Sequence, residues 1–247
     1  MIKYTKVIII LEFAMSEKDL SLTVRPIARI KNDFPTKFGL PRQSGLAASL
    51  LSKIVFEPAY RVPEALRGIE QYSHLWLIWG FSEVFGEKWS PTVRPPRLGG
   101  NERLGVFATR APYRPNPLAL SVVKLEGVEK TSEGLVLSVS GADIMDGSPI
   151  YDIKPYLPYV DSKADAVGGF TDSAKNYKLT VDFPSELLLK IREDARDALI
   201  EALEGDPRPA YHSSADRIYG FEYSFYEVKF TVNDGVLHVT EVYERKK

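Results

Sequence analysis

The stretch 118–141, LALSVVKLEGVEKTSEGLVLSVSG, decides the fold class of this chain. Its two halves, Leu118–Val128 and Gly134–Gly141, each predict a strand, and the polar residues between them predict a turn. Upstream, the run Ser73–Phe81 (SHLWLIWGF) is continuously apolar, which is typical of a buried strand. These segments show no helical period and favour a β protein.

Further strands are expected on either side of these three. Leu22–Ile30 alternates imperfectly and is β-rich, Gly45–Phe56 is predicted to end in a strand, and Gly105–Thr109 is predicted to be one. Ile150–Tyr159 carries prolines and is predicted to be extended but irregular. Because about six strands follow one another with few helices, we expect a mainly β fold, a barrel or sandwich, and not a doubly wound sheet.

The composition changes after about Asp161, and a small α+β unit is expected to follow. Ser185–Leu203 has apolar residues at helical spacing, with Ser185 as the predicted cap and Gly205 as the predicted end. Asn233-Asp234-Gly235 lies between two strand-like runs and predicts a hairpin. The expected organisation is an N-terminal extension at 1–21, a β-barrel domain at 22–165 and a C-terminal domain at 172–247.

The composition excludes several classes of site. The 247 residues carry a net charge of −1, so any RNA binding must come from a local patch. There is no cysteine, which excludes disulfides and thiolate chemistry, and His74, His212 and His238 lie too far apart to predict a metal site. The apolar run at 7–11 is too short for a signal peptide or a membrane span, so we expect a cytoplasmic protein with no membrane partner.

A local excess of arginine marks the segment 89–117. Between Arg94 and Arg114 there are five arginines and one acid, Glu102, on a backbone rich in Pro and Gly. A guanidinium presents a planar fork that suits phosphate and carboxylate oxygens. The segment therefore predicts a binding loop, with a solvated loop of paired arginines as the alternative.

Three further segments are candidates for chemistry. Pro41-Arg42-Gln43-Ser44-Gly45 is a turn that displays an Arg and a Gln, although on its own an ordinary polar turn explains it better. Residues 140–156 hold three aspartates that could be a base, ligand acceptors or turn caps. At 206–211, two prolines flank Arg208, which we expect to be exposed with Tyr211 for contact with RNA; a packed helix stop is the alternative.

Two familiar fingerprints are missing from the sequence. No Gly-x-Gly-x-x-Gly lies between a strand and a helix, and Gly99-Gly100 matches neither that motif nor a P-loop. No Gly-x-Ser-x-Gly is present either. Dinucleotide-binding and serine-hydrolase functions therefore lose support.

Taken together, these segments resemble the TrmO (YaeB/TsaA) family of tRNA methyltransferases from about Leu22 to the C-terminus. The matching signatures, in the family's order, are 41–46 (PRQSGL), 72–76 (YSHLW), 91–101 (PTVRPPRLGGN), 105–110 (GVFATR), 114–117 (RPNP), 152–158 (DIKPYLP) and 206–211 (DPRPAY). The resemblance implies an antiparallel, non-Rossmann β-barrel that binds S-adenosyl-L-methionine (SAM), a homodimer, and a C-terminal extension that contacts the tRNA anticodon loop. It also implies N6-methylation of threonylcarbamoyl-adenosine at position 37 of threonine tRNA.

The resemblance and the residue chemistry together give a candidate site. The expected cofactor-binding residues are Pro41, Arg42, Gln43, Ser82, Glu83, Arg110, Leu120, Ser140, Gly141, Ala142 and Asp143. A base is needed because an acylated nitrogen is a poor nucleophile, and its candidates are Asp143, Asp146, Asp152 and Tyr156. The expected tRNA-binding residues are Arg94, Arg97, Arg114, Asn116, Lys154, Arg208 and Tyr211.

Two other functions stay open at this point. The first is a SAM-dependent methyltransferase that acts on another acceptor. The second is a non-catalytic barrel that binds SAM or RNA.

Overall fold

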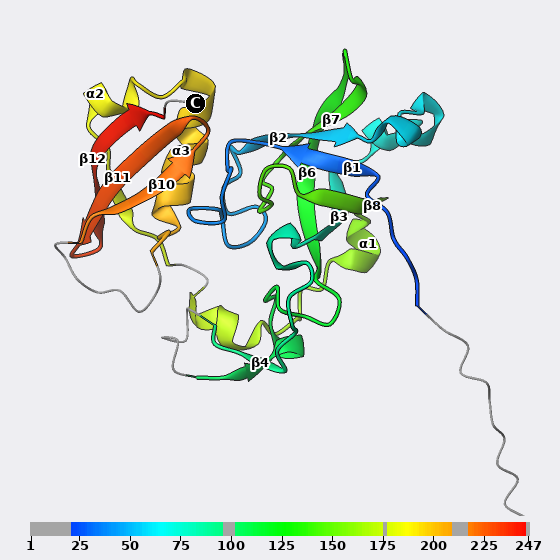
Figure 1. Ribbon diagram of the computed structural model, residues 1–247, viewed down its shortest axis with the longest axis horizontal. Helices are drawn as coiled ribbons and strands as arrows, with labels where there is room; N and C mark the ends of the chain where they lie inside the picture. Colours follow the sequence, from blue (N-terminus) through cyan, green and yellow to red (C-terminus); the bar gives the residue numbers. More distant parts are fainter. Residues whose placement is uncertain (1–20, 96–101, 175–176, 209–216, 246–247) are drawn as a thin grey trace, which may run out of the picture.

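The computed structural model describes residues 21–95, 102–174, 177–208 and 217–245. Among the predicted features, Arg97, Tyr211 and all but the last residue of the N-terminal extension lie outside these ranges. Figure 1 shows two units joined by a connecting segment, one built on a ring of strands and the other on a small sheet with short helices beside it.

Six antiparallel strands form the first sheet and close on themselves. They are β1 (Ala28–Lys31), β2 (Leu51–Phe56), β3 (His74–Gly80), β6 (Leu118–Thr131), β7 (Gly134–Ser140) and β8 (Pro149–Pro155). The order around the ring is β1-β2-β7-β6-β3-β8, and β8 pairs back onto β1, which makes a closed barrel. The predicted mainly β class is confirmed, and the closed ring agrees with the barrel alternative.

The β6–β7 hairpin and the β3–β6 pair are the longest pairings of the barrel. Thr131 pairs with Gly134 across the turn, and the register shifts between Leu125 and Gly127, where a bulge bends β6. Side chains alternate along both strands, so that Val123, Leu137 and others lie in the barrel core. The buried face of β3 supplies Leu75 and Leu77 to the same core.

The second sheet has the order β10-β11-β12-β9. Its strands are β9 (Thr180–Asp182), β10 (Tyr219–Tyr223), β11 (Tyr226–Asn233) and β12 (Val236–Glu244). The predicted hairpin at Asn233-Asp234-Gly235 is present: Asp234 (φ 46°) and Gly235 (φ 78°) both have positive φ, as a type I′ turn requires. The helices beside this sheet are α2 (Ser185–Leu188) and α3 (Arg196–Glu204).

Short elements occupy the remaining segments. They are the strand pair β4 (Thr92–Val93) and β5 (Leu104–Gly105), the helix α1 (Pro158–Asp161), and the 3-10 turns η1 (Pro58–Tyr60), η2 (Pro63–Leu66), η3 (Ile69–Gln71), η4 (Ser82–Val84), η6 (Val106–Ala108), η7 (Gly169–Ala174) and η8 (Glu193–Ala195).

The prediction of one helix over Ser185–Leu203 is wrong. The chain is helical only at α2, η8 and α3, and Arg192 between them is extended, with ψ 143°. Tertiary contacts explain the break, because the Arg192 N–H donates to the Tyr226 hydroxyl (3.3 Å) and its guanidinium pairs with Asp33. Ser185 does not cap α2; Pro184 occupies that position and makes no side-chain cap bond.

Three strand predictions also need correction. The strand predicted at Leu22–Ile30 begins only at Ala28, where β2 and β8 offer hydrogen-bonding partners. Gly105–Thr109 is mostly the 3-10 turn η6, because only Leu104 and Gly105 pair, with β4. The segment predicted as extended but irregular at Ile150–Tyr159 contains the strand β8, whose prolines lie at its two ends and whose register with β3 shifts between Ile78 and Trp79.

The loop between β1 and β2 joins the two units. Phe34, Ala47 and Leu50 are almost fully buried in the core formed by α3 and the second sheet. The Phe34 ring meets the Tyr223 ring edge-on at 5.1 Å between centroids. Figure 1 shows this loop, in blue, reaching from the barrel toward α3. The loop therefore belongs to the barrel domain by sequence and to the second core by packing.

Ser49 anchors this loop on α3, and its loss is expected to cost stability. Its N–H and Oγ donate to the two carboxylate oxygens of Glu201, each at 2.9 Å. Ser49→Ala removes one bond to a charged acceptor, so the free energy of unfolding in urea should fall by about 1.5–3 kcal/mol.

Ser52→Ala is the matched control. The Ser52 Oγ is buried and has no hydrogen-bond partner among the described residues, so its removal should leave the unfolding free energy almost unchanged. Equal losses in the two variants would show that Glu201 does not hold the loop.

Candidate functional site

Two glycines bring two of the predicted cofactor segments into contact. The Gly45 N–H donates to the Gly141 carbonyl (2.8 Å), and the Gly141 N–H donates to the Leu50 carbonyl (3.1 Å). Both glycines have left-handed backbones, with φ of 80° and 76°. A Cβ on Gly141 would contact the Gly45 Cα at 3.4 Å, and the positive φ of Gly141 would strain any residue with a side chain. The turn 41–45 and the segment after β7 thus form one backbone surface.

A cluster of polar side chains lies on this surface. The Arg110 guanidinium donates to Gln43 Oε1, and the Gln43 amide donates to the Arg42 carbonyl (2.6 Å). Asp143 lies close enough to Arg110 for the positive charge of the guanidinium to act to lower the pKa of its carboxyl group. Gln43, Arg110 and Asp143 come from three segments far apart in the sequence, and the structure brings them together.

The Asp143 carboxylate ends a chain of hydrogen bonds from the barrel. The Trp79 indole N–H donates to Ser121 Oγ (2.9 Å), and Ser121 Oγ donates to Asp143 Oδ1 (2.5 Å). An indole N–H can only donate, so Ser121 must accept from Trp79 and direct its own hydrogen at Oδ1. Oδ1 is therefore an acceptor in this arrangement.

Burial raises the pKa of Asp143 above its ordinary value. The hydrogen bond from Ser121, the Asp143 and Ser44 backbone groups and the charge of Arg110 act the other way, but they do not outweigh burial. A carboxylate with a raised pKa beside a fixed cation is a candidate for proton transfer.

Arg42 faces away from this cluster and contacts the C-terminal unit. Its Nη2 donates to the carbonyls of Asp206 (2.8 Å) and Arg208 (2.9 Å). Arg208 in turn makes two bonds to the Asp206 carboxylate, at 2.8 and 3.0 Å, and its side chain is only 14% exposed. The expectation of an exposed Arg208 is wrong, because this pairing holds its guanidinium against the protein.

The Asp206 carboxylate is held in its charged form. Burial acts to raise its pKa, but the hydrogen bonds from Arg208 and from the Tyr177 hydroxyl (2.8 Å) outweigh burial, and the pKa lies below its ordinary value. The segment 206–208 is therefore a fixed turn, and Arg42 of the barrel unit donates hydrogen bonds to its backbone.

Two family models match the chain: the tRNA-methyltransferase O N-terminal domain over residues 29–162 and the TrmO C-terminal domain over residues 176–245. The chain belongs to the TrmO family. It is 37% identical over 227 residues to a tRNA (adenine(37)-N6)-methyltransferase of Escherichia coli strain K12, a match that covers 89% of this chain and 97% of that relative. An enzyme of the same name from Eikenella corrodens is 44% identical over 172 residues, which cover 69% of this chain and 97% of the relative.

Solved structures agree with this membership. A crystal structure of TrmO from Pseudomonas aeruginosa superposes with a TM-score of 0.72 at 32% identity, and the match covers 91% of this chain and all of that one. A probable S-adenosyl-L-methionine-binding protein of Pyrococcus abyssi is 36% identical over 153 residues, 62% of this chain and 78% of that relative.

The other residues predicted to bind the cofactor lie on neighbouring elements of the barrel unit. Ser82 and Glu83 form the turn η4 directly after β3. Leu120 is 50% exposed on β6, on the face opposite Ser121. Ser140 Oγ donates to Glu126 (2.6 Å), and Ala142 is buried in the barrel core. Any contact of Gly141 or Ala142 with a ligand is therefore expected to come from the backbone.

Three of the four candidate bases have other contacts. Asp146 accepts from the Asn32 N–H (3.0 Å) and holds the loop after β1. Asp152 pairs with Lys154 (2.8 Å) on β8. Tyr156 packs on Trp76, with ring centroids 5.7 Å apart, and its N–H donates to the His74 carbonyl at the start of β3. Asp143 alone among them belongs to the Gln43–Arg110 cluster.

The described arginines of the predicted binding loop differ in their roles. Arg114 donates to the carbonyls of Val106 (3.0 Å) and Thr109 (2.7 Å) and so braces η6. Arg103 donates to the Thr92 hydroxyl (2.8 Å), whereas Arg94 is exposed. Asn116 is exposed in the turn before β6.

Sequence reasoning missed Trp79 and Ser121. The signal was a serine within the otherwise apolar run 118–123 at the start of β6, where a buried hydroxyl must find a partner. Within the described ranges, no group of His, Asp and Glu has the arrangement of a metal site, and no helix is long and apolar enough to cross a membrane.

Proposed function

We propose that this chain transfers a methyl group from SAM to N6 of adenosine 37 in tRNA. Its family membership supports this, because relatives aligned over most of the chain are named tRNA (adenine(37)-N6)-methyltransferases. The observation that carries the proposal is the junction of Gly45 with Gly141, on which Gln43, Arg110 and Asp143 converge.

The chemistry of this junction fits SAM. The cofactor has an adenine, a ribose and a zwitterionic methionine end, and needs both hydrogen-bond donors and acceptors. Arg110 and backbone N–H groups supply donors, and Gln43 and Asp143 supply acceptors. The position where a Cβ on Gly45 would lie is open, so a ligand could approach the main chain there. When bound, SAM would supply an electrophilic methyl group on a cationic sulfur.

Asp143 is our proposed base. The threonylcarbamoyl group acylates the acceptor nitrogen and delocalises its lone pair, so removal of a proton favours attack. Ser121 occupies Oδ1, and Oδ2 would receive the proton. Arg110 favours the ionised carboxylate before transfer, and the rest of the cluster positions the reactants. Asp146, Asp152 and Tyr156 remain alternatives that substitution can separate.

The C-terminal unit is our proposed tRNA-contacting domain, with the barrel as the cofactor domain and the boundaries predicted above. Its segment 206–211 would contact the anticodon loop, together with Arg94, Arg97, Arg114, Asn116 and Lys154 from the barrel unit. Threonine tRNA as the substrate, a homodimer and a cytoplasmic location complete the proposal. Light scattering of the purified chain would test the dimer.

The name of the Pyrococcus abyssi relative favours one alternative, a barrel that binds SAM without transferring its methyl group. Incubation of the protein with methyl-labelled SAM and cellular tRNA, followed by nuclease mapping, separates the two. Label on the nucleotide at position 37 is the expected result. SAM binding without label in any tRNA would support the binding protein.

A further inference from the structure

A hollow lies between the segments 84–89 and 112–117. It has a volume of about 480 Å³, within the range of roughly 300–1,000 Å³ typical of small-ligand sites. The Ser90 N–H donates to the Tyr113 carbonyl (3.2 Å) and ties the two walls together. Pro112, Pro115 and Pro117 line one wall, so its backbone has little freedom.

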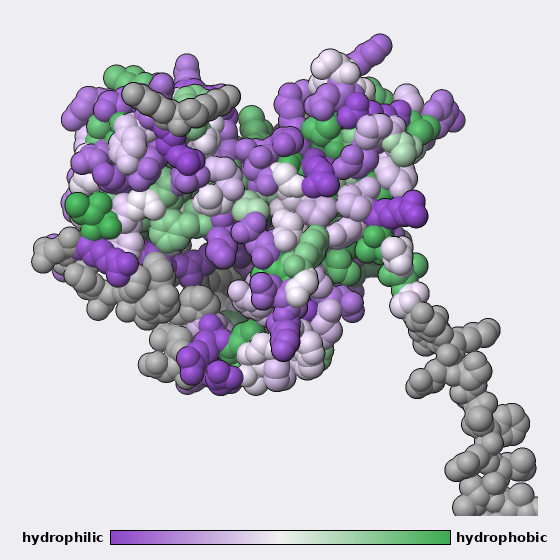
Figure 2. Space-filling view, viewed as in Figure 1, coloured by the Kyte–Doolittle hydropathy of each residue, from purple (hydrophilic) through white to green (hydrophobic). Residues whose placement is uncertain are grey.

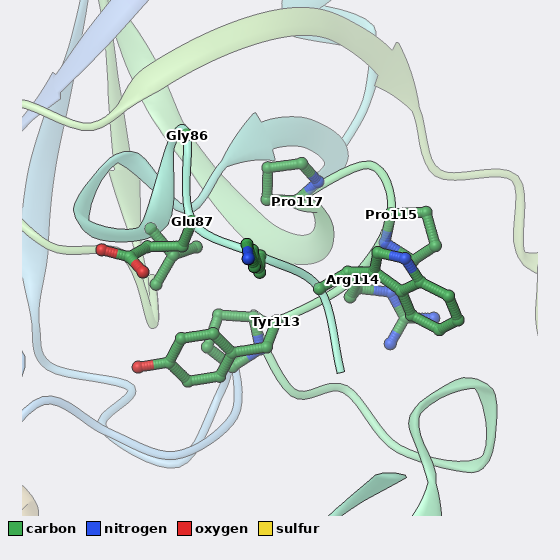
Figure 3. A pocket seen from close by; sticks show the side chains of 10 residues that line it. Gly86, Glu87, Tyr113, Arg114, Pro115 and Pro117 are labelled. Carbon is green, nitrogen blue, oxygen red and sulfur yellow. The ribbon is translucent and has the colours of Figure 1, made fainter. Parts of the chain in front are cut away.

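Two aromatic rings and two cations line the hollow. Trp89 is 50% exposed and Tyr113 is 44% exposed, although both rings are large and apolar. Lys88 and Arg114 bring positive charge, and Glu87 brings a carboxylate. In Figure 3 the Tyr113 ring and the Glu87 side chain point to the same side, and Arg114 lies on the other.

Of the two cations, Arg114 is held in place by contacts with the protein. Arg114 is braced by its bonds to the Val106 and Thr109 carbonyls, and its guanidinium carbon lies 5.8 Å from the Phe107 ring centre. Phe107 is itself 74% exposed. A fixed guanidinium among exposed aromatic rings loses little freedom when it binds a phosphate.

This combination suits one nucleotide of single-stranded RNA. Aromatic rings stack on bases, cations bind the phosphate, and a carboxylate accepts hydrogen bonds from base amino groups. One wall of the hollow also contacts the residue directly before Ser82, a predicted cofactor-binding residue, because the Phe81 N–H donates to the Pro117 carbonyl (3.0 Å). The lining segment 112–117 also begins two residues after Arg110 of the Gln43–Arg110–Asp143 cluster, so a base bound here would lie against the segment that leads directly from that cluster.

We propose that this hollow binds a nucleotide of the anticodon loop that neighbours the methylated one, with Trp89 and Tyr113 stacking on its base. The inference rests on the proposed function, since it takes tRNA as the substrate. The bound nucleotide itself is not methylated. The hollow would increase the affinity for tRNA and fix which nucleotide reaches the methyl donor.

The test is direct binding of an isolated anticodon stem-loop RNA, which does not depend on methyl transfer. Trp89→Ala and Tyr113→Ala should each weaken its affinity by about 5- to 100-fold. Trp89→Phe should restore most of the affinity, because a phenyl ring still stacks. Calorimetric binding of SAM to each variant reports whether the fold around the site is retained. Tyr159→Ala, which removes an 84% exposed ring on α1, is the control and should bind RNA normally.

The outcomes separate the two proposals. Methyl transfer by the unchanged protein with no RNA affinity lost in Trp89→Ala or Tyr113→Ala would overturn the stacking site and leave the function standing. Loss of RNA binding in these variants, with SAM binding kept, supports the site even if no tRNA is methylated. A change in oligomeric state with unchanged RNA affinity would assign the hollow to contact between two copies and overturn the inference.

Discussion

Replacing Asp143 with Asn should lower the rate of methyl transfer at saturating SAM and tRNA by about 100- to 10,000-fold, the range that a positioned base contributes. Asn keeps the size of the side chain and can still accept from Ser121, but it cannot take a proton. The measurement is single-turnover transfer of labelled methyl to tRNA. Asp152→Asn is the matched comparison, since Asp152 pairs with Lys154 on β8. A large loss in that variant and none in Asp143→Asn would make Asp152 the base.

The pH dependence gives a second signature of Asp143. Its pKa is raised by burial, and the proposed base must be ionised, so the rate should fall as pH falls through this raised pKa. The sign for stability is the opposite. Ionisation is harder in the folded state than in the unfolded one, so the group reduces stability as pH rises from the unfolded pKa through the folded one. Both dependences should be absent in Asp143→Asn.

Ser121→Ala should shift the pH dependence of the rate without removing the base. The Ser121 hydrogen bond lowers the pKa of Asp143, so its removal should raise that pKa further and move the rate profile to higher pH. A lower rate with no shift of the profile would mean that Ser121 only supports the packing of the barrel.

Replacing Arg42 with Ala should weaken tRNA binding by about 10- to 100-fold, with a much smaller effect on SAM. The variant loses two bonds from a charged donor to the carbonyls of Asp206 and Arg208, each worth about 1.5–3 kcal/mol. In the variant, tRNA binding itself would have to order the segment 206–208, and the free energy that this costs would lower the affinity for tRNA. Equilibrium binding of tRNA and of SAM measures the two effects separately.

Arg42→Lys is the charge-conserving control for Arg42→Ala. It keeps the charge but cannot reproduce the geometry of the guanidinium. If SAM affinity fell as far as tRNA affinity in both variants, the Arg42 side chain would be a cofactor ligand, and the contact with the C-terminal unit would be incidental.

Deleting the chain after Asp172 would not test the role of the C-terminal unit cleanly. Phe34, Ala47 and Leu50 are buried in the core of that unit, and the deletion would expose them to water. The same loop continues into Gln43 and Gly45, so the deletion would disturb the proposed cofactor surface as well. Arg42→Ala leaves this core in place.

The β fold could be predicted because its strands have local patterns. β3, β6 and β7 each alternate or run apolar over at least seven residues, and the Asn233-Asp234-Gly235 turn has its own chemistry. The helix predicted at 185–203 failed because Asp33 and Tyr226 hold Arg192 in an extended conformation. Asp33 lies 159 residues away in sequence, and no local pattern encodes such a contact.

The candidate site, like the fold, could be predicted from the sequence only in part. Motif resemblance identified the turn 41–45 and Asp143, but it could not give the direction of the Arg42 side chain or choose among four bases. The choice of Asp143 depends on its bond with Ser121, which lies 22 residues away on β6. Figure 2 shows mainly polar side chains with small, separate apolar patches on one face of the molecule.

The central claim is tested most directly by methyl transfer from labelled SAM to bulk tRNA taken from cells with and without the threonylcarbamoyl modification. The account predicts label only in the modified pool, located at position 37. Label in neither pool, with SAM binding confirmed, would contradict it and point to another acceptor or to a binding protein.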